Sequence, residues 1–236
     1  MTTHDETSRR FEPALAFHGL VVLVLTIMTS AGAPGRRTGA LLLAAWGLVF
    51  FSVFFAAGQK VRPRPAADYI TYARLLMGLG FYLAARAERL GAPAALLWVL
   101  AMEIADGLDG WAARRWGPTA FGAAGDMESD AYVILLFSTA AVWFAGLPLW
   151  ALIPGLIRYL FFFPFLVLKP RDAVFPKALS LYSKTVCVAT VFCLASAWYL
   201  PKAATAAVAV ASVLIVLSFL WETVFYVARR VHTRNR

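Results

Sequence analysis

Carboxylates are concentrated in one short part of an otherwise apolar chain. Six of the 13 acidic residues fall at the ends of two neighbouring apolar segments: Glu103, Asp106, Asp109, Asp126, Glu128 and Asp130. An ionised carboxylate in the middle of a membrane costs about 2.5–3.5 kcal/mol on the insertion scale, so unpaired acids here would be strongly disfavoured. The two nearby arginines, Arg114 and Arg115, cannot neutralise them all. Bound metal ions or protonation must therefore compensate the charge.

The spacing of the aspartates favours metal. Asp106 and Asp109 are three residues apart, whereas Asp126 and Asp130 are four apart and follow a turn at residues 117–118. Each pair shares one helical face, and a helical hairpin can bring the two faces together. Oxygen ligands without His or Cys suit Mg²⁺ or Mn²⁺, and two such ions can polarise a phosphoryl group and stabilise a leaving oxygen. We therefore predict a site for two Mg²⁺ or Mn²⁺ ions.

Other residues of the two segments have less specific roles. Gly107, Gly110 and Ala113 lie on or beside the acidic face and leave room for a nucleotide against the helix backbone. Glu103 lies one turn before Asp106. The sequence pattern is equally compatible with contact between Glu103 and the site and with a packing or solvated position for this side chain. Glu128 faces away from the two aspartates that flank it and is not expected to bind metal.

The segments that carry these residues belong in a membrane. The chain is 61% apolar and 15% charged, with a mean hydropathy of +0.71, whereas soluble domains have about 25% charged residues. A membrane span needs about 20 apolar residues. Eight spans can be placed, at 13–32, 39–57, 68–87, 93–112, 124–145, 147–168, 180–200 and 203–227. Because the loops between them are short, we predict an all-α, multi-pass integral membrane protein with antiparallel neighbouring helices.

The net charge of +9 reflects how Lys and Arg are distributed among the loops. With the N-terminus inside, 14 of the 22 basic residues lie in cytoplasmic segments, five lie outside and three lie within spans. This asymmetry predicts that both termini and the acidic cluster face the cytoplasm, and we expect a bacterial inner membrane. It also explains the positive charge without a nucleic-acid partner. A cleaved signal peptide is the alternative for the first span, but its apolar stretch is long for one.

A Pro- and Arg-rich stretch at 59–65 divides the chain. We predict an N-terminal extension, residues 1–65, with two spans and a basic cytoplasmic linker, and a six-helix core, residues 66–236. Cys187 and Cys193 share no helical face and are interpreted as small packing residues. The three histidines are scattered and form no set of ligands, so zinc chemistry is not expected.

The two acidic motifs resemble a family signature. Residues 106–114, Asp-Gly-Leu-Asp-Gly-Trp-Ala-Ala-Arg, are followed by residues 122–130, Gly-Ala-Ala-Gly-Asp-Met-Glu-Ser-Asp. Together they are similar to the D-x2-D-G-x2-A-R-x8-G-x3-D-x3-D signature of CDP-alcohol phosphatidyltransferases. Seven residues, not eight, separate Arg114 from Gly122, and the shorter spacing falls in the turn. The resemblance extends over about residues 66–228, which match the six-helix core of that family.

The resemblance implies a role for each matching residue. Asp106, Asp109 and Asp126 would ligate metal, and Asp130 would be both a ligand and the general base. Residues that would line the site of the CDP moiety are Gly110, Ala113, Arg114 and Gly122. A carboxylate beside a metal-polarised hydroxyl can accept its proton, and an arginine can hydrogen-bond a phosphate.

A further motif of the family begins its first core helix. The usual P-N-x-x-T-x-x-R is represented here by Thr71 and Arg74, while Ala67 and Asp68 replace the Pro and Asn. The resemblance therefore adds Thr71 and Arg74 to the candidate CDP site.

Two basic residues within spans are candidates for binding the acceptor. Arg158 lies about eleven residues into its span, where reaching the headgroups is awkward. Lys184 and Thr185 resemble the end of a G-K-x-K-T segment in phosphatidylglycerolphosphate synthases, although the upstream Gly-Lys is absent. Ionisable groups within spans usually face a polar cavity. Pairing with the aspartates or with the donor diphosphate is the competing interpretation.

The resemblance implies transfer of a phosphatidyl group from CDP-diacylglycerol to a small polar alcohol, with release of CMP. The two internal cations favour a phosphorylated polyol such as glycerol 3-phosphate. The same residues would also serve transfer of a phosphocholine- or phosphoethanolamine-type group to diacylglycerol. Intramembrane prenyltransferases place their acidic motifs far apart, and an ion-coupled transporter typically has repeated halves, so both are less favoured. A homodimer is left open.

Overall fold

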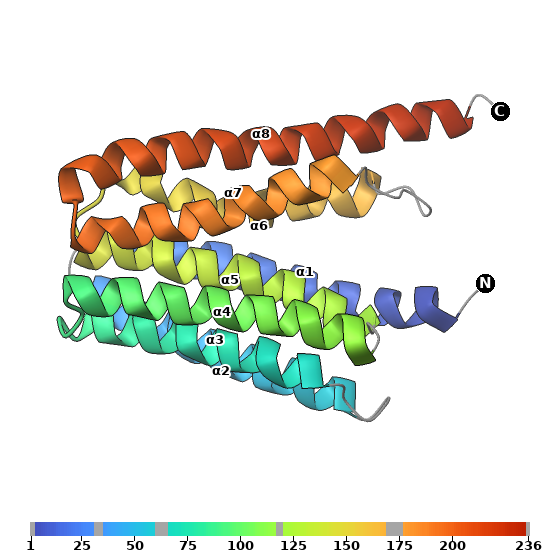
Figure 1. Ribbon diagram of the computed structural model, residues 1–236. Helices are drawn as coiled ribbons and strands as arrows, with labels where there is room; N and C mark the ends of the chain where they lie inside the picture. The colour runs from blue at the N-terminus through green and yellow to red at the C-terminus, as the bar shows by residue number, and fades with distance from the viewer. Residues whose placement is uncertain (1–2, 31–34, 60–65, 117–119, 169–176, 235–236) are drawn as a thin grey trace.

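The computed structural model describes residues 3–30, 35–59, 66–116, 120–168 and 177–234. Within these ranges the regular structure is helical throughout, without a strand. In chain order the helices are α1 (Thr3–Ser30), α2 (Gly35–Gln59), α3 (Ala66–Arg86), α4 (Ala92–Trp116), α5 (Ala120–Phe144), η1 (Leu149–Leu152), α6 (Ile153–Leu168), α7 (Lys177–Ala195), η2 (Ser196–Trp198) and α8 (Pro201–Arg234). The long helices run side by side as an elongated bundle (Figure 1).

Five of the described helices are long and apolar enough to cross a membrane. Their candidate spans are Glu12–Ser30, Thr38–Ala57, Gly125–Phe144, Leu181–Trp198 and Pro201–Phe225. The predicted all-α membrane fold is therefore confirmed. The helices α3 and α4 carry charged residues of the candidate site, and α6 belongs to a shorter apolar stretch. Crossing by these three helices, and thus the count of eight spans, stays a prediction.

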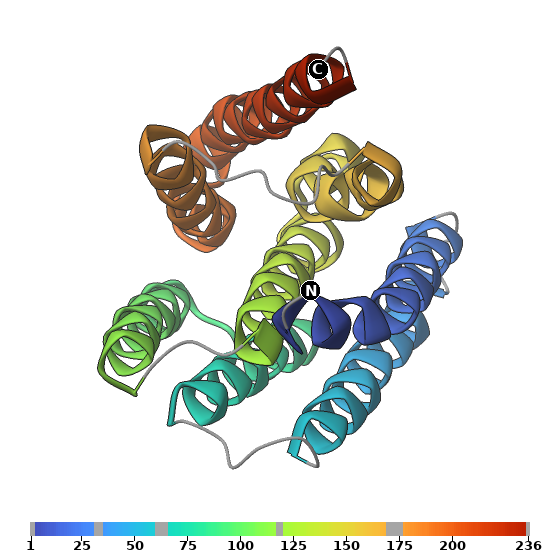
Figure 2. The same ribbon diagram turned by 90° about the vertical axis from the view of Figure 1, so that its right-hand side faces the viewer.

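Helix α5 is the centre of the bundle. Of its candidate span, 83% is buried inside the protein, compared with 28–39% for the other four. It packs against α1, α2, α3, α6 and α7, and the view along the bundle shows it surrounded by other helices (Figure 2). Close packing on several sides leaves a helix little freedom to shift. Side chains on α5 are therefore held in defined directions.

The first two helices pack directly on this centre. Helix α2 lies against α3 and α5, and α1 lies against α5 and α6. Gly47 of α2 faces the ring of Tyr132, because a Cβ at this glycine would lie 2.3 Å from the ring. The Tyr132 hydroxyl donates a hydrogen bond to the carbonyl oxygen of Leu43. The proposed division into residues 1–65 and 66–236 is a prediction, and the two parts share an extensive interface.

The ends of the helices that carry the candidate site residues lie together at one end of the bundle. The N-terminal ends of α1, α3 and α5 lie there with the C-terminal ends of α4 and α8 (Figure 1). Helix α3 packs along both α4 and α5. Its side chains can therefore contact both acidic motifs.

Candidate functional site

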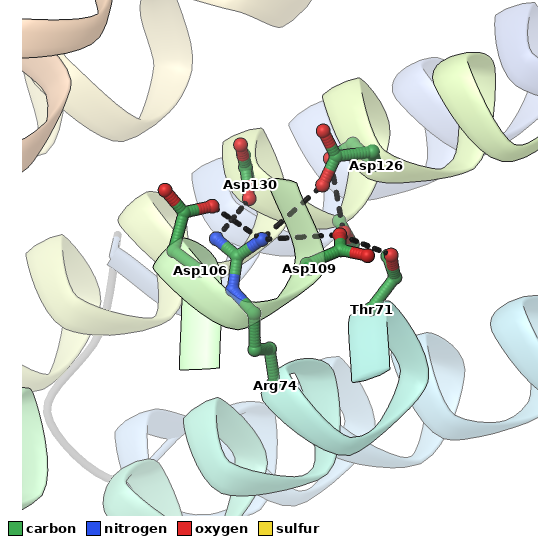
Figure 3. A network of polar contacts seen from close by, with 7 residues as sticks. Thr71, Arg74, Asp106, Asp109, Asp126 and Asp130 are labelled. Carbon is green, nitrogen blue, oxygen red and sulfur yellow. Dashed lines mark hydrogen bonds and ion pairs between the residues drawn. The ribbon is translucent and has the colours of Figure 1, made fainter. Parts of the chain in front are cut away.

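The four aspartates of the two motifs lie close together. Asp106 and Asp109 project from α4, and Asp126 and Asp130 project from α5 toward them (Figure 3). Pairs three or four residues apart on a helix share a face, and α3 packs along both α4 and α5. The helical spacing within each motif and the packing of α4 and α5 along α3 together produce one cluster of carboxylates.

Three of these carboxylates have the geometry of a metal site. One oxygen from each of Asp106, Asp126 and Asp130 lies within 4.8 Å of the other two. Oxygen ligands about 2.1–2.5 Å from a divalent ion are separated by roughly 3–5 Å, so the three oxygens fit around one cation. Their side chains are 39–47% exposed. A cation and a phosphate can therefore reach them.

Asp109 lies deeper in the cluster. Its Oδ2 accepts a hydrogen bond of 2.7 Å from the Thr71 hydroxyl, and its Oδ1 is buried without a hydrogen-bond partner among the described residues. A buried carboxylate oxygen without a partner is costly. A cation beside this oxygen would satisfy it, so Asp109 also fits a role as a ligand.

Arg74 of α3 lies among the aspartates rather than beside them. Its Nη1 is 2.8 Å from Asp106 and 3.2 Å from Asp126, and its Nη2 is 2.5 Å from Asp130 (Figure 3). Asp109 lies farther, at 4.0 Å. One guanidinium charge can balance only one of the four carboxylates, so the others need further positive charge or protons. The cluster therefore keeps a strong attraction for divalent cations.

The remaining candidates for the CDP site are only partly described. Gly110 is half-buried on α4, and a Cβ at the nearby Gly107 would meet no described atom within 4 Å. This part of α4 therefore has open space beside it. Ala113, Arg114 and Gly122 belong to α4 and α5, but their side chains lie outside the described part of the protein.

The two candidates for acceptor binding lie apart from the aspartate contacts. Arg158 of α6 places Nη2 at 3.3 Å from Glu128 Oε2, and Lys184 is exposed on α7. No ion pair joins either residue to the four aspartates within the described ranges. Sequence reasoning did not identify Glu128 as the partner of Arg158, or the buried His18 on the other side of Glu128. The position of His18, an ionisable residue within an apolar span, was the signal that could have identified it as a candidate.

Fold and site together define an integral membrane protein with a carboxylate cluster suited to divalent cations. The sequence profile of the CDP-alcohol phosphatidyltransferase family matches residues 65–232, and the chain belongs to this family. A search of curated proteins and a search of solved structures found no match. Members of the family transfer groups from CDP-alcohol substrates at lipid membranes and generally depend on divalent metal ions.

Proposed function

We propose that the protein transfers a phosphatidyl group from CDP-diacylglycerol to a small alcohol and releases CMP. The observation that carries this proposal is the meeting of three carboxylate oxygens from the two family motifs within 4.8 Å. Membership of the family supports a CDP-alcohol donor. The choice of CDP-diacylglycerol as donor and of a small alcohol as acceptor belongs to the proposal.

Asp106, Asp109, Asp126 and Asp130 would hold Mg²⁺ or Mn²⁺, with two ions as the expected number. Such ions offset the negative charge of the donor diphosphate and of the departing CMP. Asp130 would accept the proton of the acceptor hydroxyl. The hydroxyl oxygen then bonds to the β-phosphorus, and the bond from that phosphorus to the bridging oxygen breaks. The electron pair of this bond leaves with CMP.

The residues around the aspartates would position the nucleotide. In this proposal Arg74 serves as the countercharge of the carboxylates when no cation is bound, and Thr71 orients Asp109 through their hydrogen bond. The remaining residues of the CDP site are Gly110, Ala113, Arg114 and Gly122. Arg114 supplies donors for a phosphate.

A phosphorylated polyol such as glycerol 3-phosphate is the acceptor to test first. Lys184 is the cation on which this choice depends most, because the Arg158 guanidinium already pairs with Glu128. A phosphate group would be a strong partner for a lysine within a span. Transfer of a phosphocholine-type group to diacylglycerol is the competing reaction.

We place the site at the cytoplasmic face of a bacterial inner membrane, with both termini on that side. In support, the N-terminal end of α1 and the C-terminal end of α8 lie at the same end of the bundle as the C-terminal end of α4 and the N-terminal end of α5, the halves of these helices that carry the aspartates (Figure 1). The excess of Lys and Arg in the loops of that end agrees with the positive-inside rule.

Purified protein in lipid nanodiscs tests the reaction. The protein is incubated with labelled CDP-diacylglycerol, Mg²⁺ and one acceptor at a time, and both CMP and the lipid product are measured. We expect CMP release that requires an acceptor, and an Asp126→Asn variant provides the inactive control. A preparation that consumes CDP-choline and diacylglycerol but not CDP-diacylglycerol would replace our proposal with the competing reaction. Absence of CMP release from any CDP-alcohol would refute it.

A further inference from the structure

Glu128 occupies a special position on α5. It lies two residues after Asp126 and two before Asp130, so its side chain leaves the helix about 160° away from theirs. The carboxylate is buried, with 3% of the side chain exposed. An isolated carboxylate inside a membrane bundle is costly and needs partners.

Two helices supply these partners: α6 provides Arg158 and the neighbouring Tyr159 hydroxyl, and α1 provides His18. Arg158 of α6 approaches Oε2 at 3.3 Å, and His18 of α1 places Nε2 at 3.7 Å from Oε1. The second distance is longer than a direct hydrogen bond. A side-chain shift of about 0.5 Å or one bridging water would connect the two atoms. His18 precedes the part of the chain that the family profile matches, residues 65–232.

The neighbours of His18 determine which ring nitrogen carries the proton. Trp46 of α2 donates its indole N–H to His18 Nδ1 at 3.0 Å. An indole nitrogen is only a donor, so Nδ1 must accept and the neutral imidazole carries its proton on Nε2. This proton faces Glu128, and His18 Nε2 is buried without another partner among the described residues. Phe50 stacks on the ring with a centroid distance of 3.9 Å, which fixes its plane.

Docking of the α1–α2 hairpin does not by itself require a polar cluster. Apolar and aromatic contacts already join it to α5, as at Gly47 with Tyr132 and at Gly125 with Phe54. Replacing a buried ion pair by apolar residues is often neutral or stabilising. What the polar cluster adds is a direction for Glu128, and thus a polar constraint on the rotation of α5 beside the close packing that already surrounds this helix.

The rotation of α5 sets where the carboxylates of Asp126 and Asp130 lie. A carboxylate at a radius of about 6 Å from the helix axis moves by about 2 Å when the helix rotates by about 20°. That displacement equals a whole metal–oxygen distance. Control of the rotation is therefore control of the metal geometry.

We propose that His18 is a positioning residue, which sets the direction of Asp126 and Asp130 by holding Glu128 on the opposite face of α5. The α1–α2 hairpin is then a working part of the metal site, although it lies outside the region that the family profile matches. This inference rests on the proposed function only in taking the aspartates as metal ligands.

The test measures Mn²⁺ binding by purified full-length protein, using electron paramagnetic resonance of free Mn²⁺. His18→Leu removes the donor facing Glu128, whereas His18→Gln can place an amide N–H near the position of Nε2. Ser52→Ala is the matched control, since it removes a 2.9 Å hydrogen bond between the hairpin and Tyr72 of α3. We expect His18→Leu to weaken Mn²⁺ binding about tenfold, His18→Gln to recover most of the loss, and Ser52→Ala to bind normally.

Wild-type Mn²⁺ affinity in folded His18→Leu would overturn the proposal, and so would equal losses in the Leu and Gln variants. If His18→Leu does not fold, Mn²⁺ binding is measured on the Trp46→Phe variant instead. This variant keeps an aromatic ring at position 46 but removes the donor to His18 Nδ1, so the imidazole can carry its proton on either nitrogen. Weakened Mn²⁺ binding then supports the proposal, and unchanged binding refutes it. Failure of the wild-type protein to bind Mn²⁺ would instead count against the proposed function.

Discussion

Replacing Arg74 by glutamine should make the stability of the fold depend on divalent cations. The Arg74 side chain is 10% exposed, and its guanidinium lies 2.5–3.2 Å from three aspartates. Removing one partner from a buried ion pair costs about 3–5 kcal/mol. The aspartates are partly exposed, and water screens some of the remaining repulsion. We therefore expect the free energy of unfolding to fall by about 2–3 kcal/mol without metal.

Bound metal should reverse most of this loss. A ligand at 100 times its dissociation constant stabilises the folded state by about 2.7 kcal/mol. In the wild-type protein the cation must compete with Arg74 for the same oxygens. Mg²⁺ should therefore stabilise Arg74→Gln more than wild type.

Thermal unfolding in detergent can measure both effects with a dye that fluoresces on reacting with thiols. Cys187 and Cys193 are free and partly buried, so they report unfolding. In EDTA the midpoint of Arg74→Gln should lie about 5–10 °C below that of wild type. Arg86→Gln is the control, because Arg86 lies about 18 Å farther along α3 at 1.5 Å per residue. Equal midpoints in EDTA, or an equal increase with Mg²⁺ in both proteins, would refute the reasoning.

Three further predictions follow from the site and the topology. Turnover should be abolished by EDTA and restored by Mg²⁺ or Mn²⁺, and turnover that persists in EDTA would contradict a metal site. Asp130→Asn should abolish turnover but retain donor binding, measured by equilibrium binding of labelled donor, whereas Asp109→Ala should lose both. In a background without native cysteines, a cysteine at Arg62 or Arg171 should react with an impermeant maleimide only from the cytoplasm, and one at Arg37 only from outside. Labelling of all three from one side would exclude the eight-span topology.

The pairing of the aspartates within each motif was predictable from the sequence because it depends on local geometry, whereas the meeting of the two pairs depends on how α4 and α5 pack along α3. The spacing of Asp106 and Asp109, and of Asp126 and Asp130, fixes each pair on one face of its own helix. The long apolar segments predicted the membrane fold in the same way, since a span is recognised from about 20 consecutive residues.

The contacts of Arg74 were not predictable from the spacing of residues along single helices. The sequence assigned Arg74 to the nucleotide by its resemblance to a family motif, whereas its partners Asp126 and Asp130 lie 52 and 56 residues away in the chain. Such contacts depend on how α3 packs against α5, and helical periodicity carries no information about that packing. His18 and Glu128 are separated even farther, and His18 looked like a scattered residue.

The acceptor shows how such a distant contact changes a functional inference. From the sequence, Arg158 is an uncompensated charge within a span, and a phosphate on the acceptor was the natural partner for it. In the structure Glu128 compensates this charge at 3.3 Å, so the presence of Arg158 no longer requires an anionic acceptor. The case for a phosphorylated polyol then depends mainly on Lys184. If Lys184→Ala raises the KM for glycerol 3-phosphate about tenfold, equivalent to 1.4 kcal/mol, and leaves the donor KM unchanged, that case holds. If the enzyme uses an unphosphorylated alcohol efficiently, the Arg158 and Glu128 pair belongs to the architecture of α5 alone.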